Sequence, residues 1–138
     1  MSGGLMINAL LRETGRPVSG EEARNLQDAY MREYHDRIER VRALPGACEL
    51  LKTLTDLAVP WAIATSADLH TAMPTLGLLS LDPEAVVVTR DEVQFAKPDP
   101  DLFFEAARRL GVDIQSYIVV GDSVWDMLAA PPARERSA

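Results

Sequence analysis

Three short, largely apolar runs of residues constrain the fold of this chain more than any other feature of its sequence. They are Trp61–Thr65, Val86–Val88 and Tyr117–Val120, and amphipathic helical patterns separate them. Strands that are buried on both faces have this composition, and strands that alternate with helices form parallel sheets covered on both sides. The sequence therefore predicts an α/β fold with three parallel strands.

The first part of the chain has a different pattern, in which apolar residues recur at helical spacing. An apolar residue stands at every third or fourth position from Ala23 to Val41, which predicts one long amphipathic helix. Ser19 is placed to cap this helix, with Glu22 three residues later as in a capping box. A shorter helix is predicted near Leu5–Leu10. We expect three parts: a helical segment at residues 1–43, an α/β core at 44–130 and a disordered tail at 131–138.

The charge of the chain argues against two classes of partner. The formal net charge is −7, so nucleic acid and anionic membrane surfaces would repel the protein. No apolar run approaches the roughly 18 residues of a membrane span, and the single cysteine, Cys48, excludes an internal disulfide. We expect a cytoplasmic protein with no nucleic acid or membrane partner. A phosphorylated small molecule remains compatible, because a bound divalent cation would invert the local field.

Polar side chains follow each of the three apolar runs. Thr65 and Ser66 end the first run, Lys97 lies in the loop after the second, and Asp122 and Asp126 follow the third. The carboxyl ends of parallel strands lie at one edge of a sheet, so these groups are expected in one pocket. Hydroxyl and ammonium groups suit phosphate oxygens, and carboxylates suit Mg²⁺.

Each of these residues also has an ordinary structural interpretation. Thr65 could be a turn residue at a strand end, and Lys97 could be a solvated loop lysine. Asp122 and Ser123 could cap the last helix, with Asp126 on its outer face. The combination of these groups in one chain, in this order, favours a functional site.

Three segments resemble, in the same order, motifs two, three and four of the haloacid dehalogenase superfamily. They are Ala62–Ser66, Phe95–Pro100 and Ile118–Asp126, and the resemblance is strongest to the phosphoglycolate phosphatase and β-phosphoglucomutase-like branch. It implies part of a three-layer Rossmann-like core, a parallel sheet with helices on both faces, with residues 1–43 as a helical cap. It also implies an Mg²⁺-dependent phosphatase acting on a small phosphorylated metabolite.

The resemblance also implies a role for each candidate residue. Thr65 and Ser66 would bind phosphoryl oxygens, and Lys97 would bind and neutralise the transferring phosphoryl group. Thr65 and Lys97 would thus be the catalytic residues present. Asp122 would bind Mg²⁺ directly, and Asp126 would hold a metal-bound water or support the site.

One family motif has no counterpart in these 138 residues. It is an Asp-x-Asp pair that ends an apolar strand and supplies the nucleophile, whereas the Asp99–Asp101 pair here follows Lys97 between prolines. We therefore expect a chain truncated at both ends, with turnover absent or very weak. In the superfamily the missing strand lies between those ending at Thr65 and Asp122. Its absence would leave unpaired strand edges that allow self-association.

Two other functional classes share some of these features. The chain could be a non-catalytic module that binds phosphate or metal, or a fragment that complements a missing segment in trans. Receiver domains also place Asp, Thr or Ser, and Lys at strand ends, but their acceptor Asp precedes the other two. Here Asp122 follows Thr65 and Lys97, and this order argues against a receiver domain.

Overall fold

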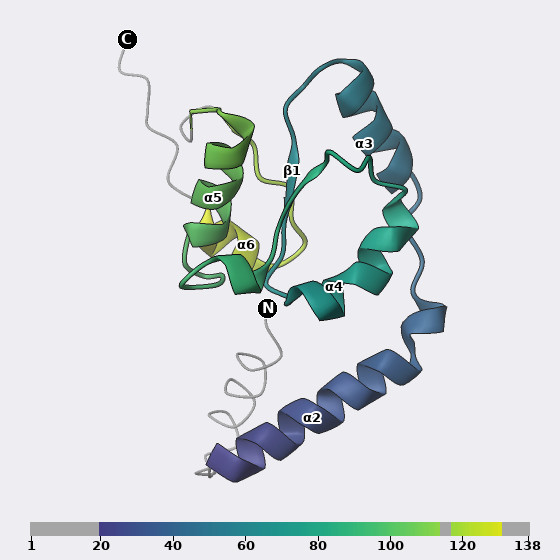
Figure 1. The fold of residues 1–138 in the computed structure, drawn as a ribbon, viewed down its shortest axis with the longest axis vertical. Coiled ribbons are helices and arrows are strands. Elements are labelled where there is room, and N and C mark those ends of the chain that lie inside the picture. The colour runs from purple at the N-terminus through teal and green to yellow at the C-terminus, as the bar shows by residue number, and fades with distance from the viewer. Residues whose placement is uncertain (1–19, 114–116, 131–138) are drawn as a thin grey trace. The chain divides into compact units, whose positions relative to one another are not determined.

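The computed structural model describes residues 20–113 and 117–130, and the chain divides into two compact units, Met1–Arg42 and Ala43–Ala138 (Figure 1). The predicted helix near Leu5–Leu10, the predicted cap at Ser19 and the predicted tail at 131–138 lie outside the described residues.

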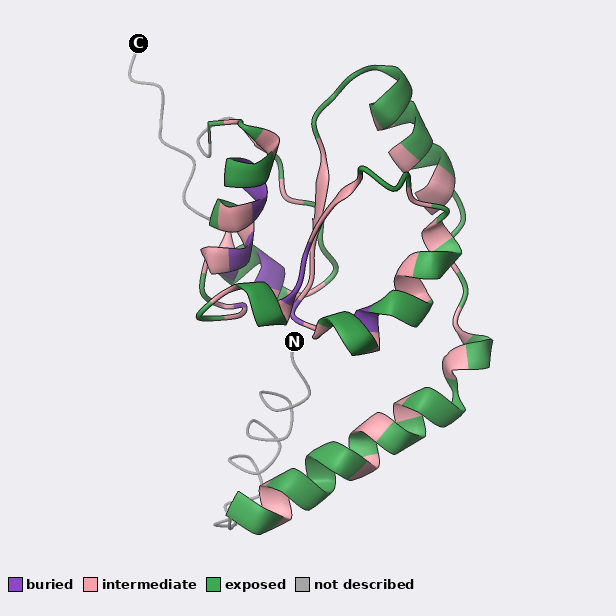
Figure 2. Ribbon diagram, in the orientation of Figure 1, coloured by how far each residue is buried: buried purple, intermediate pink, exposed green. Residues whose placement is uncertain are grey.

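The described part of the first unit is one helix and a short extension. Helix α2 spans Gly20–Asp36, and the 3₁₀ turn η1 spans Ile38–Arg40. The prediction of a helix continuing to Val41 was wrong, because the backbone tightens at Arg37, whose N–H donates to Tyr34 three residues back at 3.1 Å. No residue of α2 is buried, as Figure 2 shows by colour.

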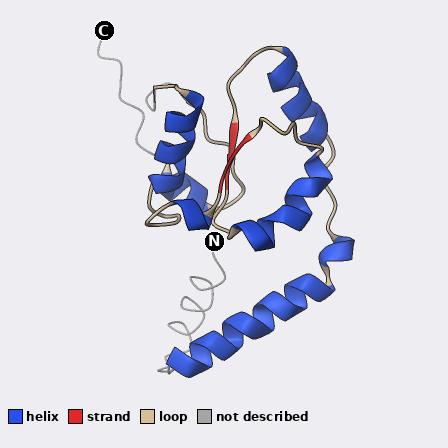
Figure 3. Ribbon diagram, in the orientation of Figure 1, coloured by secondary structure: helices blue, strands red, loops and turns tan. Residues whose placement is uncertain are grey.

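The second unit contains a parallel pair of strands (Figure 3). Strand β1 is Ala62–Ala64 and β2 is Val86–Val88, with Ala62 opposite Val86 and Ala64 opposite Val88. Helix α4, Leu69–Leu76, and the 3₁₀ turn η2, Gly77–Leu79, connect them. Both strands fall within their predicted runs, and the prediction of an α/β fold with a parallel sheet is confirmed.

The core forms where α5, Asp101–Leu110, packs on the two strands. Val88 and Leu102 are fully buried, and Ala106 is 8% exposed beside them. The spacing of Leu102 and Ala106 is one helical turn, so both side chains face the sheet. Gly111 ends the helix in the left-handed region at φ 65°, a conformation that glycine commonly supplies at helix C-termini.

The prediction of a third strand was wrong for the described residues. Tyr117–Val120 forms no strand, and the described sheet has two strands only. Ile118 is 91% exposed and Val120 86% exposed. An apolar sequence favours a strand only when a neighbouring strand completes its hydrogen bonds, and within the described residues this segment has no such neighbour.

The remaining helices begin at identifiable capping residues. Helix α3, Ala47–Asp56, follows Gly46 at φ 85°, and α6, Val124–Ala129, follows Ser123. The 3₁₀ turn η3 spans Arg90–Glu92. Helix α5 begins at Asp101, with Pro100 as its N-cap residue. The Asp101 carboxylate accepts a 3.0 Å hydrogen bond from the Phe95 N–H in the preceding loop.

Part of the predicted apolar surface is left without a cover. Leu50 in α3 and Leu57, which follows the helix as its C-cap residue, are 51% and 68% exposed. Among residues 20–113 and 117–130, no helix combines the length and the apolar character needed to cross a bilayer.

Candidate functional site

Two hydroxyl groups lie at the carboxyl end of β1. Thr65 extends the strand pairing, because its N–H donates to Val88 O at 2.9 Å. Its Oγ1 accepts a 3.1 Å hydrogen bond from the Ala67 N–H, which leaves the hydroxyl proton available to donate. Ser66 is buried, and its Oγ has no hydrogen-bond partner among the described residues. An unpaired buried hydroxyl costs about 1–3 kcal/mol, so we expect this atom to have a partner other than the described residues.

Lys97 reaches the same strand end from the loop after β2. The residue is 8% exposed, and its Nζ donates to Ala64 O and to Asp126 Oδ1, at 2.7 Å in each case. The ring of Phe103 lies 5.4 Å from the ammonium, within the range of a cation–π contact. Lys97 is therefore not a solvated loop lysine; it joins the end of β1 to helix α6.

Asp126 supplies the buried counter-charge. It is the third residue of α6 and forms a capping box with Ser123, whose N–H and Oγ donate to Oδ2 at 3.1 and 2.6 Å. Burial opposes ionisation of the carboxyl, but the hydrogen bonds from Lys97 and Ser123 outweigh it, so the pKa of Asp126 lies below its ordinary value. The alternative that placed Asp126 on the outer face of its helix was wrong, since the residue is 7% exposed.

Asp122 lies next to this group in the chain but differs from it in environment. The residue is exposed, and it follows Gly121, whose backbone lies against the Asp126 side chain. The segments that carry all five predicted residues therefore meet, while the Asp122 carboxylate remains in solvent.

The two carboxylates at this edge differ in how far the protein itself engages them. The part of the chain that the structure describes contains no group of three or more His, Cys, Asp or Glu placed to hold a metal. Both carboxylate oxygens of Asp126 already accept hydrogen bonds. Mg²⁺ is commonly bound by one or two carboxylates together with water and phosphate oxygens. Asp122 is an exposed carboxylate at this edge, whereas Asp126 is buried and engaged by Lys97 and Ser123.

Sequence reasoning missed two residues at this site. Phe103 lies beneath the Lys97 ammonium, and no local sequence pattern indicated that contact. Gly121 approaches Asp126 more closely than any residue with a side chain could. Its place between the third apolar run and Asp122 was the one available signal.

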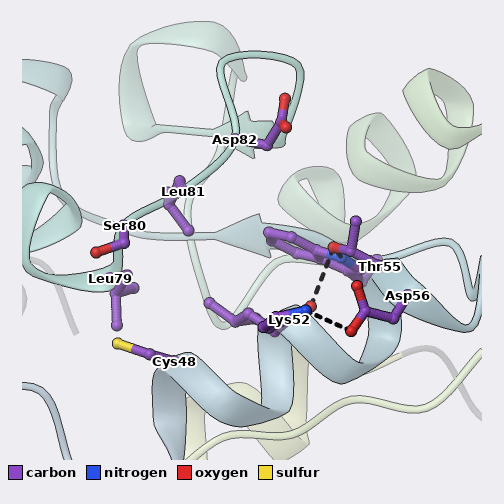
Figure 4. A pocket seen from close by; sticks show the side chains of 10 residues that line it. Cys48, Lys52, Thr55, Asp56, Leu79, Ser80, Leu81 and Asp82 are labelled. Carbon is purple, nitrogen blue, oxygen red and sulfur yellow. Dashed lines mark hydrogen bonds and ion pairs between the residues drawn. The ribbon is translucent and has the colours of Figure 1, made fainter.

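A pocket of about 310 Å³ lies away from these residues, at the amino ends of the strands (Figure 4). Trp61, just before β1, and Leu81, before β2, contribute to its wall together with α3. Two of its polar side chains pair with each other, since Lys52 Nζ donates to Asp56 Oδ2 at 2.5 Å. No predicted site residue lines this pocket.

Comparison with known proteins gives consistent matches. Residues 7–134 match the family model of haloacid dehalogenase-like hydrolases. Hexitol phosphatase A of Escherichia coli is 38% identical over 91 residues, which cover 66% of this chain and 42% of that protein. Phosphoglycolate phosphatase of Agrobacterium fabrum is 31% identical over 122 residues, which cover 87% of this chain and 52% of that protein. The chain thus spans about half the length of these curated relatives.

A solved structure supports the same assignment. The crystal structure of a hydrolase from Pseudomonas syringae superposes with a TM-score of 0.86 at 46% sequence identity, over 94% of this chain and 60% of that one. The family match, the phosphatase relatives and this shared fold agree with the groups that meet at the end of β1. The chain belongs to the haloacid dehalogenase-like hydrolase family.

Proposed function

We propose that this chain carries the phosphate-binding and cation-binding part of an Mg²⁺-dependent phosphatase that acts on a small phosphorylated metabolite. The observation that carries the proposal is the Lys97 ammonium, held at 2.7 Å from Ala64 O and from Asp126 Oδ1 at the carboxyl end of β1. The unpartnered hydroxyl of buried Ser66 at the same strand end supports it.

The hydrogen-bonding capacity of these groups suits a phosphoryl group. A lysine ammonium has three N–H donors, and Lys97 uses two on protein oxygens. Its third donor would bind a phosphate oxygen, alongside the Ser66 and Thr65 hydroxyls. Phosphoryl transfer depends chiefly on such positioning and charge neutralisation.

Asp122 would hold the Mg²⁺ ion, because it is the exposed carboxylate at this edge. The bound cation would neutralise charge on the phosphoryl oxygens. Asp126 would act through Lys97, by keeping the ammonium at the end of β1. Asp122 would therefore serve magnesium binding, and Asp126 would serve phosphate binding indirectly by holding Lys97.

Turnover would require a nucleophile that these residues do not provide. In the family an Asp-x-Asp pair at a strand end forms an aspartyl-phosphate, and the 138 residues contain no such strand end. The chain alone would bind phosphate with little or no hydrolysis. The alternative is a non-catalytic phosphate-binding or metal-binding module, or a fragment active only when a complementary segment is supplied.

The proposal extends to the two units and to a partner surface. Residues 1–43 would form the cap segment that selects the substrate, and residues 44–130 would form the core. Strand β1 pairs only with β2 in the described sheet. Its free edge and the exposed segment Tyr117–Val120 would support self-association.

The proposal is tested with the purified 138-residue chain. Inorganic phosphate is titrated calorimetrically with and without Mg²⁺, and p-nitrophenyl phosphate hydrolysis is followed in parallel. We expect binding that Mg²⁺ strengthens, with hydrolysis near the buffer rate. Lys97→Met should abolish phosphate binding, whereas Lys52→Met, at a lysine whose side chain is 74% exposed, should leave it unchanged.

Two results would overturn the proposal. One is phosphate binding that Lys97→Met does not weaken. The other is hydrolysis as fast as that of a full-length family phosphatase that also survives Asp122→Ala. Sequencing the gene upstream separates the enzyme from the non-catalytic alternative, since an apolar strand ending in Asp-x-Asp there would favour the enzyme.

A further inference from the structure

We infer that Gly121 is a positioning residue, whose missing side chain makes room for Asp126 to hold the Lys97 ammonium at the end of β1. The inference rests on the proposed function in one respect only, which is that Lys97 binds the phosphate. Gly121 itself would touch no ligand and would act through Asp126.

The geometry at Gly121 leaves no space for a side chain. A Cβ at this position would lie 2.6 Å from both Cβ and Cγ of Asp126 and 2.7 Å from its Oδ2. These distances are shorter than non-bonded carbon contacts, which are optimal near 3.5–4.0 Å. Rotation of the Asp126 side chain could not relieve the contact, because the Cβ of Asp126 is fixed to the backbone of α6. The first turn of that helix would have to move.

Steric exclusion, rather than backbone conformation, is what requires glycine here. Gly46 and Gly111 have positive φ angles of 85° and 65°, whereas Gly121 lies outside the left-handed region. Gly77 also lies outside it, and no atom lies within 4 Å of a Cβ built there. Gly77→Ala is therefore the matched control for Gly121→Ala.

Movement of Asp126 would reach Lys97 directly. The Asp126 carboxylate accepts from Ser123 on one oxygen and from Lys97 on the other. A shift of the helix turn that relieved the 2.6 Å contact would lengthen the 2.7 Å bond to Lys97. Lys97 would then lose its counter-ion, and the uncharged carbonyl oxygen of Ala64 would remain as its acceptor.

The chain offers a direct readout of the Lys97 environment because it contains only two lysines, Lys52 and Lys97. Their side chains are 74% and 10% exposed. A short pulse of acetic anhydride, followed by peptide mass spectrometry, gives the ratio of Lys97 to Lys52 acetylation. We expect Gly121→Ala to raise this ratio by about tenfold or more, the effect of losing one hydrogen bond to a charged group. Gly77→Ala should leave the ratio unchanged.

A rescue experiment keeps the inference testable if Gly121→Ala does not fold. All three atoms nearest to the added Cβ belong to the Asp126 side chain, so Asp126→Gly removes them. In that case Gly121→Ala unfolds the chain when Asp126 is present. In the Asp126→Gly background it should cause no further loss of stability, as measured by circular dichroism. Failure of the double variant to fold as well as Asp126→Gly would refute the inference.

Different results would overturn the positioning role of Gly121 and the proposed phosphate binding. A folded Gly121→Ala variant with the wild-type acetylation ratio overturns the positioning role, whatever the chain binds. A raised ratio in a wild-type chain that binds no phosphate upholds the positioning role and overturns the proposed function. As a specificity check, Asp126→Asn should raise the ratio by itself, and Gly121→Ala should add little to it.

Discussion

Lys97 and Asp126 are 29 residues apart in the chain, yet they form an ion pair of 2.7 Å in which both residues are less than a tenth exposed. The same ammonium donates to Ala64 at the end of β1. Three distant segments thus meet at one buried charge. Stability, acid sensitivity and the proposed phosphate binding all depend on this pair.

Removing one member of the pair should strongly destabilise the fold. Lys97→Met leaves a buried carboxylate without its counter-charge, and a loss of about 3–5 kcal/mol is expected. Lys52→Met breaks the exposed pair with Asp56 and should change stability by less than about 1 kcal/mol. Urea unfolding followed by circular dichroism measures both. Equal losses in the two variants would contradict the buried character of the Lys97 pair.

The free energy of unfolding should decrease in acid, because the Asp126 carboxylate becomes protonated. Its folded pKa lies below its ordinary value, so the ionised carboxylate stabilises the fold above about pH 4. That contribution is lost as the pH falls through the folded pKa. Hydrogen bonds from Arg108 and Arg109 lower the pKa of Glu105 to about 2, which acts in the same direction.

The measurement is Tm against pH from 6 to about 2 by calorimetry. Asp126→Asn should flatten the acid limb, and adding Glu105→Gln should flatten it further. An unchanged acid limb in Asp126→Asn would show that its carboxyl is not the group that titrates.

Asp122→Asn should separate cation binding from folding. The residue is exposed, so its substitution should change the free energy of unfolding by less than about 0.5 kcal/mol. The Mg²⁺ enhancement of phosphate binding should fall by at least about tenfold. Isothermal titration of phosphate at several Mg²⁺ concentrations tests this, with Asp56→Asn as an exposed control. An Mg²⁺ enhancement that persists in Asp122→Asn would assign the cation to another group.

Charges in the exposed segment Tyr117–Val120 should prevent self-association. Ile118 and Val120 are 91% and 86% exposed, and lysines on a strand edge disfavour pairing between chains. The wild-type chain should sediment with a concentration-dependent mass, and Ile118→Lys with Val120→Lys should make it monomeric. Leu57→Lys, at a residue 68% exposed on another element, should have little effect. Association that survives the double substitution would place the contact elsewhere.

Local patterns in the sequence were sufficient to predict most elements of the fold. Val86–Val88 is a β-branched run and forms β2, and Leu69–Leu76 is helical as expected. These features depend on side-chain volume, periodicity and caps within a few residues. The sequence also predicted that Thr65, Lys97 and Asp126 would lie near one strand end, although the strand expected before Asp126 does not form among the described residues.

The tertiary structure decided which segments become strands and which side chains are buried, and local sequence patterns do not determine these features. Tyr117–Val120 has the composition of a strand, but strand formation requires a partner, and the described residues provide none. The sequence placed two similar carboxylates, Asp122 and Asp126, four residues apart. Only packing shows that one is in solvent and the other is buried against Lys97, since burial and pairing depend on segments that meet in space.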